Sequence, residues 1–371
     1  MQHEITTSGP LLDGSGNLRE PGYAKRLLPI YRRADIKAPA SRIKEWDYSL
    51  VNNGHFAVAL TIADNGYMGL VSVSLLDFKE HWEQTTSPMV IMPMGKMKLP
   101  ETSAAGDIYA GGKGYQLLFE NHGDTRRLTF HMDHFRDGNP IDGSVTLTEP
   151  PEDSMVIATP FVGYPKAFYY NQKIVGMRAS GEVTFRDRVY RFDPADSFAI
   201  LDWGRGVWTY DNTWYWSGAA GEVEGKVFGF NLGYGFGDTS AATENMLFYD
   251  GNAYKLDQVT FQIPQKGNGD DDFMSPWRFT SNDGRFEALF EPVIVSIPPG
   301  KDFWRIVFPE SLAFTSETFS LSVLLSRIIG AIRIRENFLA SSSVGCTKRI
   351  EPGSWSIMYA IMFSSSSDFP T

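Results

Sequence analysis

The stretch that decides the fold runs from Ala199 to Asp250 and reads AILDWGRGVWTYDNTWYWSGAAGEVEGKVFGFNLGYGFGDTSAATENMLFYD. Successive side chains of a β-strand point to opposite faces. A strand over residues 228–236 therefore has one apolar face, made of Phe228, Phe230, Leu232, Tyr234 and Phe236. Its other face carries only Gly229, Asn231, Gly233 and Gly235. A face this bare predicts that something large packs closely against it.

Four of the nine tryptophans also fall in this stretch, namely Trp203, Trp208, Trp214 and Trp216. A strand over residues 208–216 would place the last three on one face, together with Tyr210 and Asn212. Two interpretations stay open. The rings line a cavity that holds a small molecule, or they form an ordinary aromatic core.

Length, composition and charge limit the class of protein. The 371 residues suffice for one large β domain or for two domains of ordinary size. Aromatic residues make up 14% of the chain and glycine occurs 35 times, which favours strands and tight turns over helices. The formal net charge is −10, which disfavours a nucleic-acid partner and an anionic membrane surface.

The same sequence predicts a cytoplasmic protein without cofactor or metal. The single cysteine, Cys346, fits a reducing compartment. The N-terminus has no apolar core of a signal peptide, and the most apolar window, 319–334, is short and broken by Arg327, so no stable membrane insertion is expected. No glycine loop typical of nucleotide sites occurs, and His131 and His134 would point to opposite faces of a strand.

A period of two begins at Ile43 and predicts an antiparallel meander. Apolar and polar residues alternate over 46–50, 56–62 and 71–75, with turn sequences at 52–54 and 64–66 between them. Further strands are predicted at 115–119, 128–132 and 143–148.

The run from Glu149 to Asp153 contains two prolines, which lack the backbone donor of a strand ladder, and is the predicted domain boundary. Strand patterns resume at 173–192 and continue to 292. The prediction is an all-β chain with a short N-terminal arm and two β domains, bounded as 1–40, 41–150 and 151–294. Within the arm, residues 22–33 are a short helical candidate.

Several segments together resemble the bacterial family of unknown function DUF2804, which is related to the lipocalin-like (calycin) proteins. The segments are KEWDY at 44–48, YYNQK at 169–173, DWGRGVW at 202–208, residues 231–250, and WRFTS at 277–281 followed by DGR at 283–285. The resemblance covers about residues 8–293 and implies two tandem lipocalin-like antiparallel barrels. Distant relatives of that architecture include carotenoid hydratases of the hydroxyneurosporene synthase type and some fungal cyclases, so the resemblance implies fold more than function.

Residues 295–371 depart from this family pattern. Serine is frequent there, acidic residues are few, and neither a strand nor a helix period persists. The family ends instead in a strand pair rich in phenylalanine and glycine. We therefore hypothesise that the reading frame shifts near Val295, which would leave the second barrel without its closing strands.

Asp202 and Arg205 lie between glycines and are a candidate pair. In a site, Arg205 would bind a carboxylate or enolate of the ligand, and Asp202 would orient it or act as general acid or base. The alternative is a structural ion pair that closes one end of a barrel.

Glu244 and Asn231 are polar exceptions in apolar surroundings. If Glu244 points into a cavity, burial raises its pKa and suits it to proton transfer. The alternative is a loop glutamate that caps backbone amides. Asn231 is either a polar anchor for a ligand or a brace for a neighbouring strand.

Two functions follow for the same cavity in the second barrel: binding of a hydrophobic or amphipathic small molecule, or cofactor-independent hydration, isomerisation or cyclisation. A carboxylate that points into the cavity near Arg205 would favour the enzyme. The oligomeric state is not predicted. The predicted catalytic residues are Asp202 and Glu244, and the predicted ligand-binding residues are Arg205, Trp203, Trp208, Trp214, Trp216, Asn231 and Tyr234.

Overall fold

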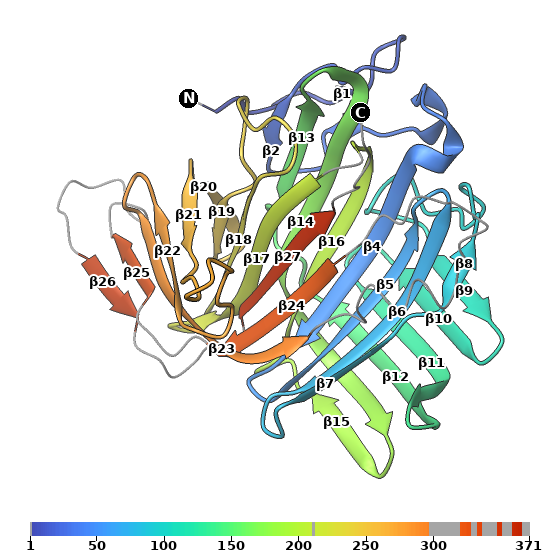
Figure 1. The fold of residues 1–371 in the computed structure, drawn as a ribbon, viewed down its shortest axis with the longest axis vertical. Coiled ribbons are helices and arrows are strands. Elements are labelled where there is room, and N and C mark those ends of the chain that lie inside the picture. The colour runs from blue at the N-terminus through green and yellow to red at the C-terminus, as the bar shows by residue number, and fades with distance from the viewer. Residues whose placement is uncertain are drawn as a thin grey trace.

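The computed structural model describes residues 2–209 and 212–296, together with four tail strands at 320–327, 332–335, 347–350 and 358–365. The prediction of an all-β chain is confirmed. The described residues form two large antiparallel sheets and a small two-stranded one, and their helical structure is limited to two three-residue 3-10 turns, η1 (Arg33–Asp35) and η2 (Ala40–Arg42) (Figure 1). Neither turn is long and apolar enough to span a bilayer.

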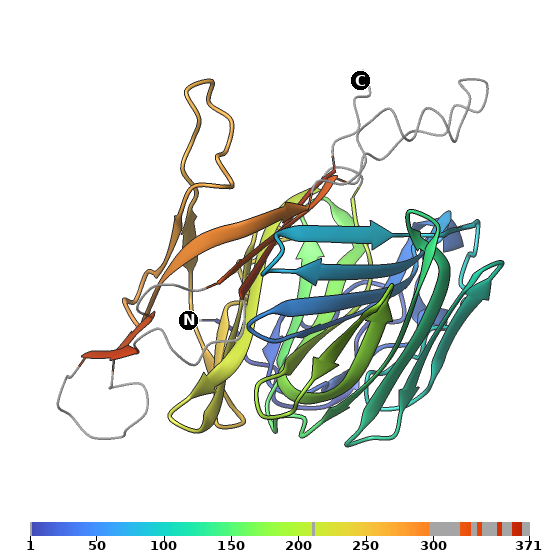
Figure 2. The ribbon, with the colours of Figure 1, turned by 90° about the horizontal axis from the view of Figure 1, so that it is seen from below.

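The first sheet contains fourteen strands, and its main path runs β7-β6-β5-β4-β16-β14-β12-β11-β10-β9. It curves strongly, so that its strands surround a concave interior (Figure 2). The path is open among the described strands. Its members are β4 (Ile43–Asn52), β5 (Phe56–Asp64), β6 (Met68–Asp77), β7 (Trp82–Thr86), β8 (Met89–Ile91), β9 (Ile108–Gly112), β10 (Tyr115–Asn121), β11 (Arg126–Arg136), β12 (Asn139–Thr148), β13 (Met155–Phe161), β14 (Tyr164–Phe185), β15 (Arg188–Phe192), β16 (Phe198–Val207) and β2 (Gly22–Ala24).

The predicted boundary at 149–153 falls inside this sheet. Strand β14 pairs with β12 on one side and with β16 on the other, and β16 pairs with β4 along its full length. The sheet therefore continues to Val207, because residues far apart in sequence complete each other's ladders. The expected strand through 208–216 is also interrupted: β16 ends at Val207 and β17 begins at Asn212.

The second sheet has eleven strands, and its main path is β20-β19-β18-β17-β27-β24-β23-β22-β21, again open among the described strands. Strand β25 pairs with β23, and β26 pairs with β25. The members are β17 (Asn212–Val223), β18 (Lys226–Tyr234), β19 (Met246–Tyr249), β20 (Asn252–Lys255), β21 (Val259–Gln262), β22 (Trp277–Ser281), β23 (Phe286–Ser296), β24 (Ser320–Arg327), β25 (Ile332–Arg335), β26 (Thr347–Ile350) and β27 (Met358–Ser365).

The prediction about the bare face of β18 is confirmed, because the first sheet packs against it. A Cβ atom added to Gly229 would lie 2.6 Å from Val175 Cγ1 of β14, and one added to Gly218 would lie 3.3 Å from Ile200 Cδ1 of β16. The apolar face of β18 turns away from the first sheet, and Phe228, Phe230 and Leu232 belong to the second sheet's own core.

Strand β14 carries a bulge at Gly176, which has a φ of +96°. Before the bulge, Val175 packs between the two sheets, whereas after it Met177 packs in the concave core of the first sheet. The extra residue therefore exchanges the two faces of the strand.

The helix predicted at 22–33 is wrong. Residues 22–24 form β2, which pairs with the edge of β13, and β3 (Pro29–Ile30) pairs with β1 (Gly9–Pro10). A glycine start and an internal proline weaken a helix, and the free edge of β13 offers backbone partners instead. Most of the tail after residue 295, on which the reading-frame hypothesis bears, lies outside the described residues, and the hypothesis stays a prediction.

We expect Gly229→Ala to lower the free energy of unfolding by about 1–3 kcal/mol, because the new methyl group overlaps Val175 and the Ala219 carbonyl, both at 2.6 Å. Urea unfolding followed by tryptophan fluorescence measures the change. The matched control is Gly54→Ala, where a Cβ meets no atom within 4 Å. Equal effects of the two substitutions would contradict the tight packing of the sheets.

Candidate functional site

Buried polar side chains gather between the two sheets, on the face of β16 that carries Asp202. Ile200 belongs to the inter-sheet core, whereas Trp203 belongs to the concave core of the first sheet. Asp202 and Arg205 are three residues apart and therefore lie on opposite faces of one strand. The structure does not bring these two predicted partners together.

The Asp202 carboxylate is held by three donors. Lys173 of β14 forms an ion pair with its Oδ2 atom, and both side chains are buried. Asn171 Nδ2 donates to Oδ1 at 2.7 Å, and Trp46 Nε1 donates to the same atom at 3.1 Å. These three donors hold the carboxylate group in one orientation.

A chain of contacts leads from Lys173 to the second sheet. The Lys173 ammonium lies 4.4 Å from the ring centroid of Trp216, in a cation–π contact. Trp216 Nε1 donates to Asn231 Oδ1 at 2.5 Å. Asn231 Nδ2 in turn donates to the Glu244 carbonyl at 2.7 Å and approaches Glu244 Oε2 at 3.3 Å. Four of the residues predicted from the sequence, Asp202, Trp216, Asn231 and Glu244, thus meet in one buried cluster.

Glu244 lies in the loop between β18 and β19 and is buried. Burial raises the pKa of its carboxyl group, whereas the nearby Lys173 ammonium and the hydrogen bond from Asn231 lower it, and the Asp202 charge raises it further. The carboxyl group packs over Gly233, where a Cβ atom would lie 2.5 Å from Glu244 Oε1. Glycine at 233 is what allows the carboxyl group to occupy this position.

Asn171 leaves an acceptor without a partner inside the cluster. Its side chain is fully buried, and its Oδ1 atom accepts no hydrogen bond, while Nδ2 is committed to Asp202. A flipped amide would point an acceptor at a carboxylate, so the orientation is fixed. The Thr159 hydroxyl on the adjacent strand β13 is also buried without a partner. A missing donor costs about 1–3 kcal/mol, so a water or a ligand hydroxyl is expected here.

Aromatic rings border the cluster. Trp46 stacks on Tyr169 with centroids 6.2 Å apart and meets Trp208 edge-on at 5.3 Å. Phe236 packs against both Tyr169 and Trp208. Burial raises the pKa of Tyr169 well above its usual value, and the charges of Glu244 and Asp202 raise it further.

Arg205 has a different environment, on the concave side of the first sheet. Its guanidinium is fully buried, pairs with Asp47 Oδ1 at 3.0 Å and donates to the carbonyls of Trp46, Gly204 and Pro100. It also lies over the Trp203 ring at 4.2 Å. These contacts fit the structural interpretation of Arg205, with Asp47 as its partner.

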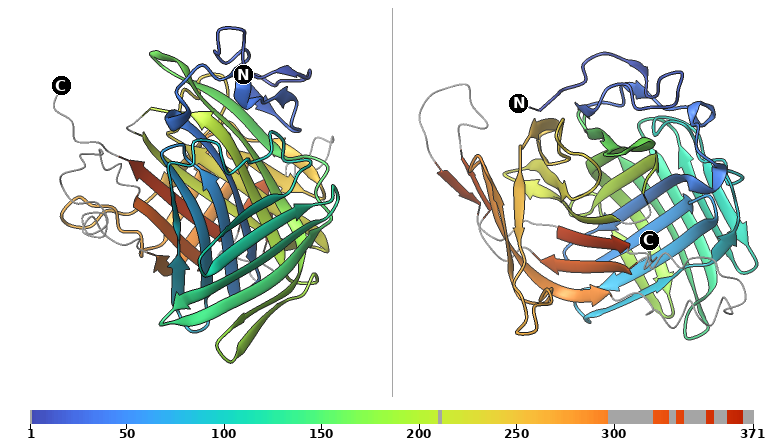
Figure 3. Two further views of the ribbon diagram at one scale, coloured as in Figure 1. Left: turned by 90° about the vertical axis from the view of Figure 1, so that its right-hand side faces the viewer. Right: turned by 45° about the horizontal axis from the view of Figure 1, so that its top comes forward.

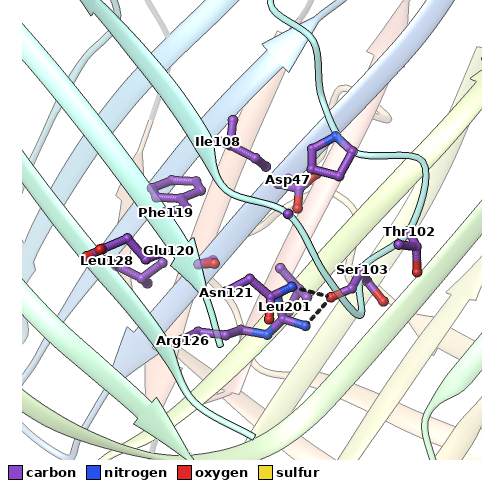
Figure 4. A pocket seen from close by; sticks show the side chains of 13 residues that line it. Asp47, Thr102, Ser103, Ile108, Phe119, Glu120, Asn121, Arg126, Leu128 and Leu201 are labelled. Carbon is purple, nitrogen blue, oxygen red and sulfur yellow. Dashed lines mark hydrogen bonds between the residues drawn. The ribbon is translucent and has the colours of Figure 1, made fainter. Parts of the chain in front are cut away.

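A small pocket also opens on the concave side (Figure 4). Its cavity volume is only about 20 Å³, and it is partly open to solvent. Asn121 and Arg126 both donate to the Ser103 carbonyl, which ties loop 100–106 across it. The Asp47 carboxylate lines this pocket and pairs with Arg205. Burial raises the pKa of Asp47 and the charges of Arg205 and Arg126 lower it, with a net value of about 6. The lining residues are Asp47, Ser49, Pro100, Thr102, Ser103, Gly106, Ile108, Phe119, Glu120, Asn121, Arg126, Leu128 and Leu201.

The remaining predicted residues do not share one cavity. Trp203 lies in the concave core, and Trp208 and Trp216 lie between the sheets. Tyr234 stacks on Tyr215 and is 36% exposed. Trp214 lies in β17, and its side chain is outside the described residues.

Sequence reasoning missed Lys173 and Asn171. A signal was present, because both are polar residues within a buried strand and alternate on one face with Tyr169 and Val175. Among the described residues, no group of three or more His, Cys, Asp or Glu side chains is arranged to hold a metal ion.

The comparisons with known proteins concern the fold. The sequence profile of the family described as "domain of unknown function (DUF2804)" matches residues 2–298. A crystal structure of a putative AttH from Nitrosomonas europaea is similar, with a TM-score of 0.50 at 12% identity, over 96% of this chain and 99% of that chain. A crystal structure of CghA is similar, with a TM-score of 0.50 at 14% identity, over 100% and 99%. Kievitone hydratase from Nectria haematococca has a TM-score of 0.45 at 9% identity, over 97% and 99%, too weak a likeness to carry an argument. No curated protein matches the chain significantly.

The indole N–H signal of Trp216 is expected to titrate with Glu244, because Asn231 connects the two side chains. The midpoint should lie above 4.5, the ordinary glutamate value, since burial raises the pKa of Glu244. Two-dimensional ¹⁵N–¹H spectra of indole-labelled protein measure it, and Glu244→Gln should abolish the transition. A midpoint at or below 4.5 would contradict the burial of this carboxyl group.

Asp47 should make stability fall as the pH rises from about 4 to about 6. Its pKa is about 6 in the folded chain and 3.8 as an ordinary aspartate, so the folded state binds the proton more tightly in this window. About two pH units at about 1.4 kcal/mol each give a loss of about 3 kcal/mol. Urea unfolding at several pH values should show this slope in the wild type but not in Asp47→Asn. The exposed-turn variant Asp124→Asn should keep it.

Proposed function

The chain belongs to the DUF2804 family, as its sequence segments predicted, and we propose that it is a cofactor-independent enzyme that transfers a proton to a hydrophobic or amphipathic small molecule. Hydration, isomerisation and cyclisation are the reactions that fit. One observation carries the proposal. Two buried carboxyl groups, Asp202 of the first sheet and Glu244 of the second, belong to one cluster, and in that cluster the Asn171 Oδ1 atom accepts no hydrogen bond.

The two carboxyl groups have different environments and therefore different roles. Glu244 has a raised pKa and is the general acid that gives its proton to the substrate. Asp202 is held by Lys173 and Asn171, and its carboxylate stabilises the positive charge that develops when an unsaturated carbon is protonated. The Asn171 carbonyl accepts a hydrogen bond from the water or hydroxyl that adds to the cation, and the proton that this group loses returns to the Glu244 carboxylate. The faces of Trp46 and Trp216 complete the surroundings.

We also propose two lipocalin-like units and a cytoplasmic location for this protein. The two sheets correspond to two lipocalin-like units, and the chemistry lies between them instead of inside the second one. The single cysteine supports a reducing, cytoplasmic setting.

Binding without chemistry is the second candidate. It would use the concave pocket, where the Asp47 carboxylate is held in an ion pair with Arg205. Asp47 and Arg126 face this space with polar groups, while Phe119 and Leu128 supply apolar lining. Such a mixture suits the polar end of an amphipathic molecule.

The proposal predicts that Glu244→Gln and Asp202→Asn each lower turnover by about 10²–10⁴-fold. A panel of unsaturated and hydroxylated hydrophobic compounds is incubated with the protein in D₂O. Mass spectrometry then follows the gain or loss of water and the incorporation of deuterium. Near-ultraviolet circular dichroism verifies that each variant is folded.

The control for this assay is Asp270→Asn, in an exposed loop, which should keep full turnover. Unchanged turnover in both site variants would reject the proton-transfer function. If no compound reacts, and native mass spectrometry finds a co-purified ligand that Arg126→Gln releases, binding in the concave pocket is supported instead.

A further inference from the structure

We propose that Gln2 is a positioning residue for Glu244, and that the N-terminal segment 2–5 is a strap that holds the Glu244 loop closed over the inter-sheet cluster. This inference rests on the proposed role of Glu244. It assigns a task to a segment for which the sequence predicted only an arm.

Gln2 uses both ends of its amide to hold the loop. Its Oε1 atom accepts from the Thr243 backbone N–H at 2.7 Å and lies 3.2 Å from the Thr243 hydroxyl oxygen. Its Nε2 atom donates to the Leu256 carbonyl at 2.9 Å and to Asp257 Oδ1 at 3.0 Å. The backbone N–H of His3 adds a bond to the Ala241 carbonyl at 2.8 Å. The bonds to Ala241 and Thr243 hold the Glu244 loop itself. The bonds to Leu256 and Asp257 connect Gln2 to the segment that follows β20.

The same Thr243 hydroxyl is bonded from the other side of the loop. It donates to the Asp257 carbonyl at 2.6 Å and accepts from Lys255 Nζ at 2.9 Å. Lys255, which is mostly buried, also donates to the carbonyls of Asn245 and Leu256. The backbone on both sides of Glu244 is therefore held, and the side chain of Gln2 adds bonds from outside the second sheet.

The strap is anchored on the first sheet (Figure 3, right). Ile5 N–H bonds to the Tyr23 carbonyl at 2.7 Å, and Tyr23 N–H bonds to the His3 carbonyl at 3.0 Å. Tyr23 lies in β2 and pairs with Ile157 of β13, which is in turn opposite Asn171 of β14. A continuous set of backbone bonds thus connects the strand of Asn171 to the loop of Glu244.

The loop joins two strands of the second sheet, β18 and β19, and contacts β13 of the first sheet on the way. Asp238 N–H bonds to the Pro160 carbonyl of β13 at 2.7 Å, and Gly237 packs beside Thr159. Glu244 and its neighbours are buried beneath these contacts. In this proposal the loop moves to admit a substrate to the cluster, and the bonds of Gln2 oppose that movement.

Gln2→Met keeps the length of the side chain and removes its hydrogen bonds to Thr243, Leu256 and Asp257. Hydrogen-exchange mass spectrometry should show amides of residues 241–247 exchanging about tenfold faster or more, because the loop opens more often. The control Gln116→Met makes the same change at an exposed position of β10 and should leave this segment unaffected. Urea unfolding should be almost unchanged in both variants.

A second readout distinguishes positioning from a merely structural role. In Gln2→Met the Trp216 indole signal should shift and its titration midpoint should move, whereas the Trp277 signal in the second core should stay in place. Thr243→Val should show the same local exchange, and combining it with Gln2→Met should add less than the sum of the two single effects.

Unchanged exchange at 241–247 and an unmoved Trp216 signal in Gln2→Met would overturn the inference. A uniform loss of stability without a local effect would overturn it as well, by returning Gln2 to a structural role. Neither readout depends on turnover. Failure of the Glu244→Gln and Asp202→Asn tests would thus reject the enzyme while leaving the strap supported.

Discussion

The buried ion pair between Lys173 and Asp202 is the interaction on which the rest of this structure depends. Two charges between packed sheets are tolerated only when each satisfies the other, and removal of one partner costs about 3–5 kcal/mol. The glycines on β17 and β18 let the second sheet approach close enough to exclude water from the pair. The contact with Trp216 then extends the pair into the second sheet. Sheet packing and candidate chemistry therefore share one requirement.

Much of the local structure could be predicted because it rests on alternation and turns. The strands beginning at Ile43 and the bare face of β18 are examples, and Asn231 was identified as a polar exception on that face. The association of Asp202 with Arg205 failed, since residues three apart on a strand face opposite ways. The true partner of Arg205 is Asp47, 158 positions away, and no local pattern encodes that pairing.

Long-range pairing also explains why the boundary at 149–153 did not separate the sheets. The prolines end a strand, but the chain after them rejoins the same sheet, because β16 pairs with β4 along its full length. The N-terminal arm shows the same effect. Its residues 22–24 adopt the extended state that β13 requires, although their own sequence favoured no strand. In both places tertiary partners decided the local conformation.

The bulge at Gly176 makes the exact length of β14 important for the cluster. Lys173 and Asn171 face the second sheet only because one extra residue separates them from the part of β14 that serves the concave core. Deleting that glycine would remove no side chain from the strand. It would nevertheless turn either Lys173 toward the concave core of the first sheet or Met177 out of that core. An insertion or deletion of one residue at this point would reverse which side chains of β14 face the second sheet. The number of residues here therefore matters as much as the residue types.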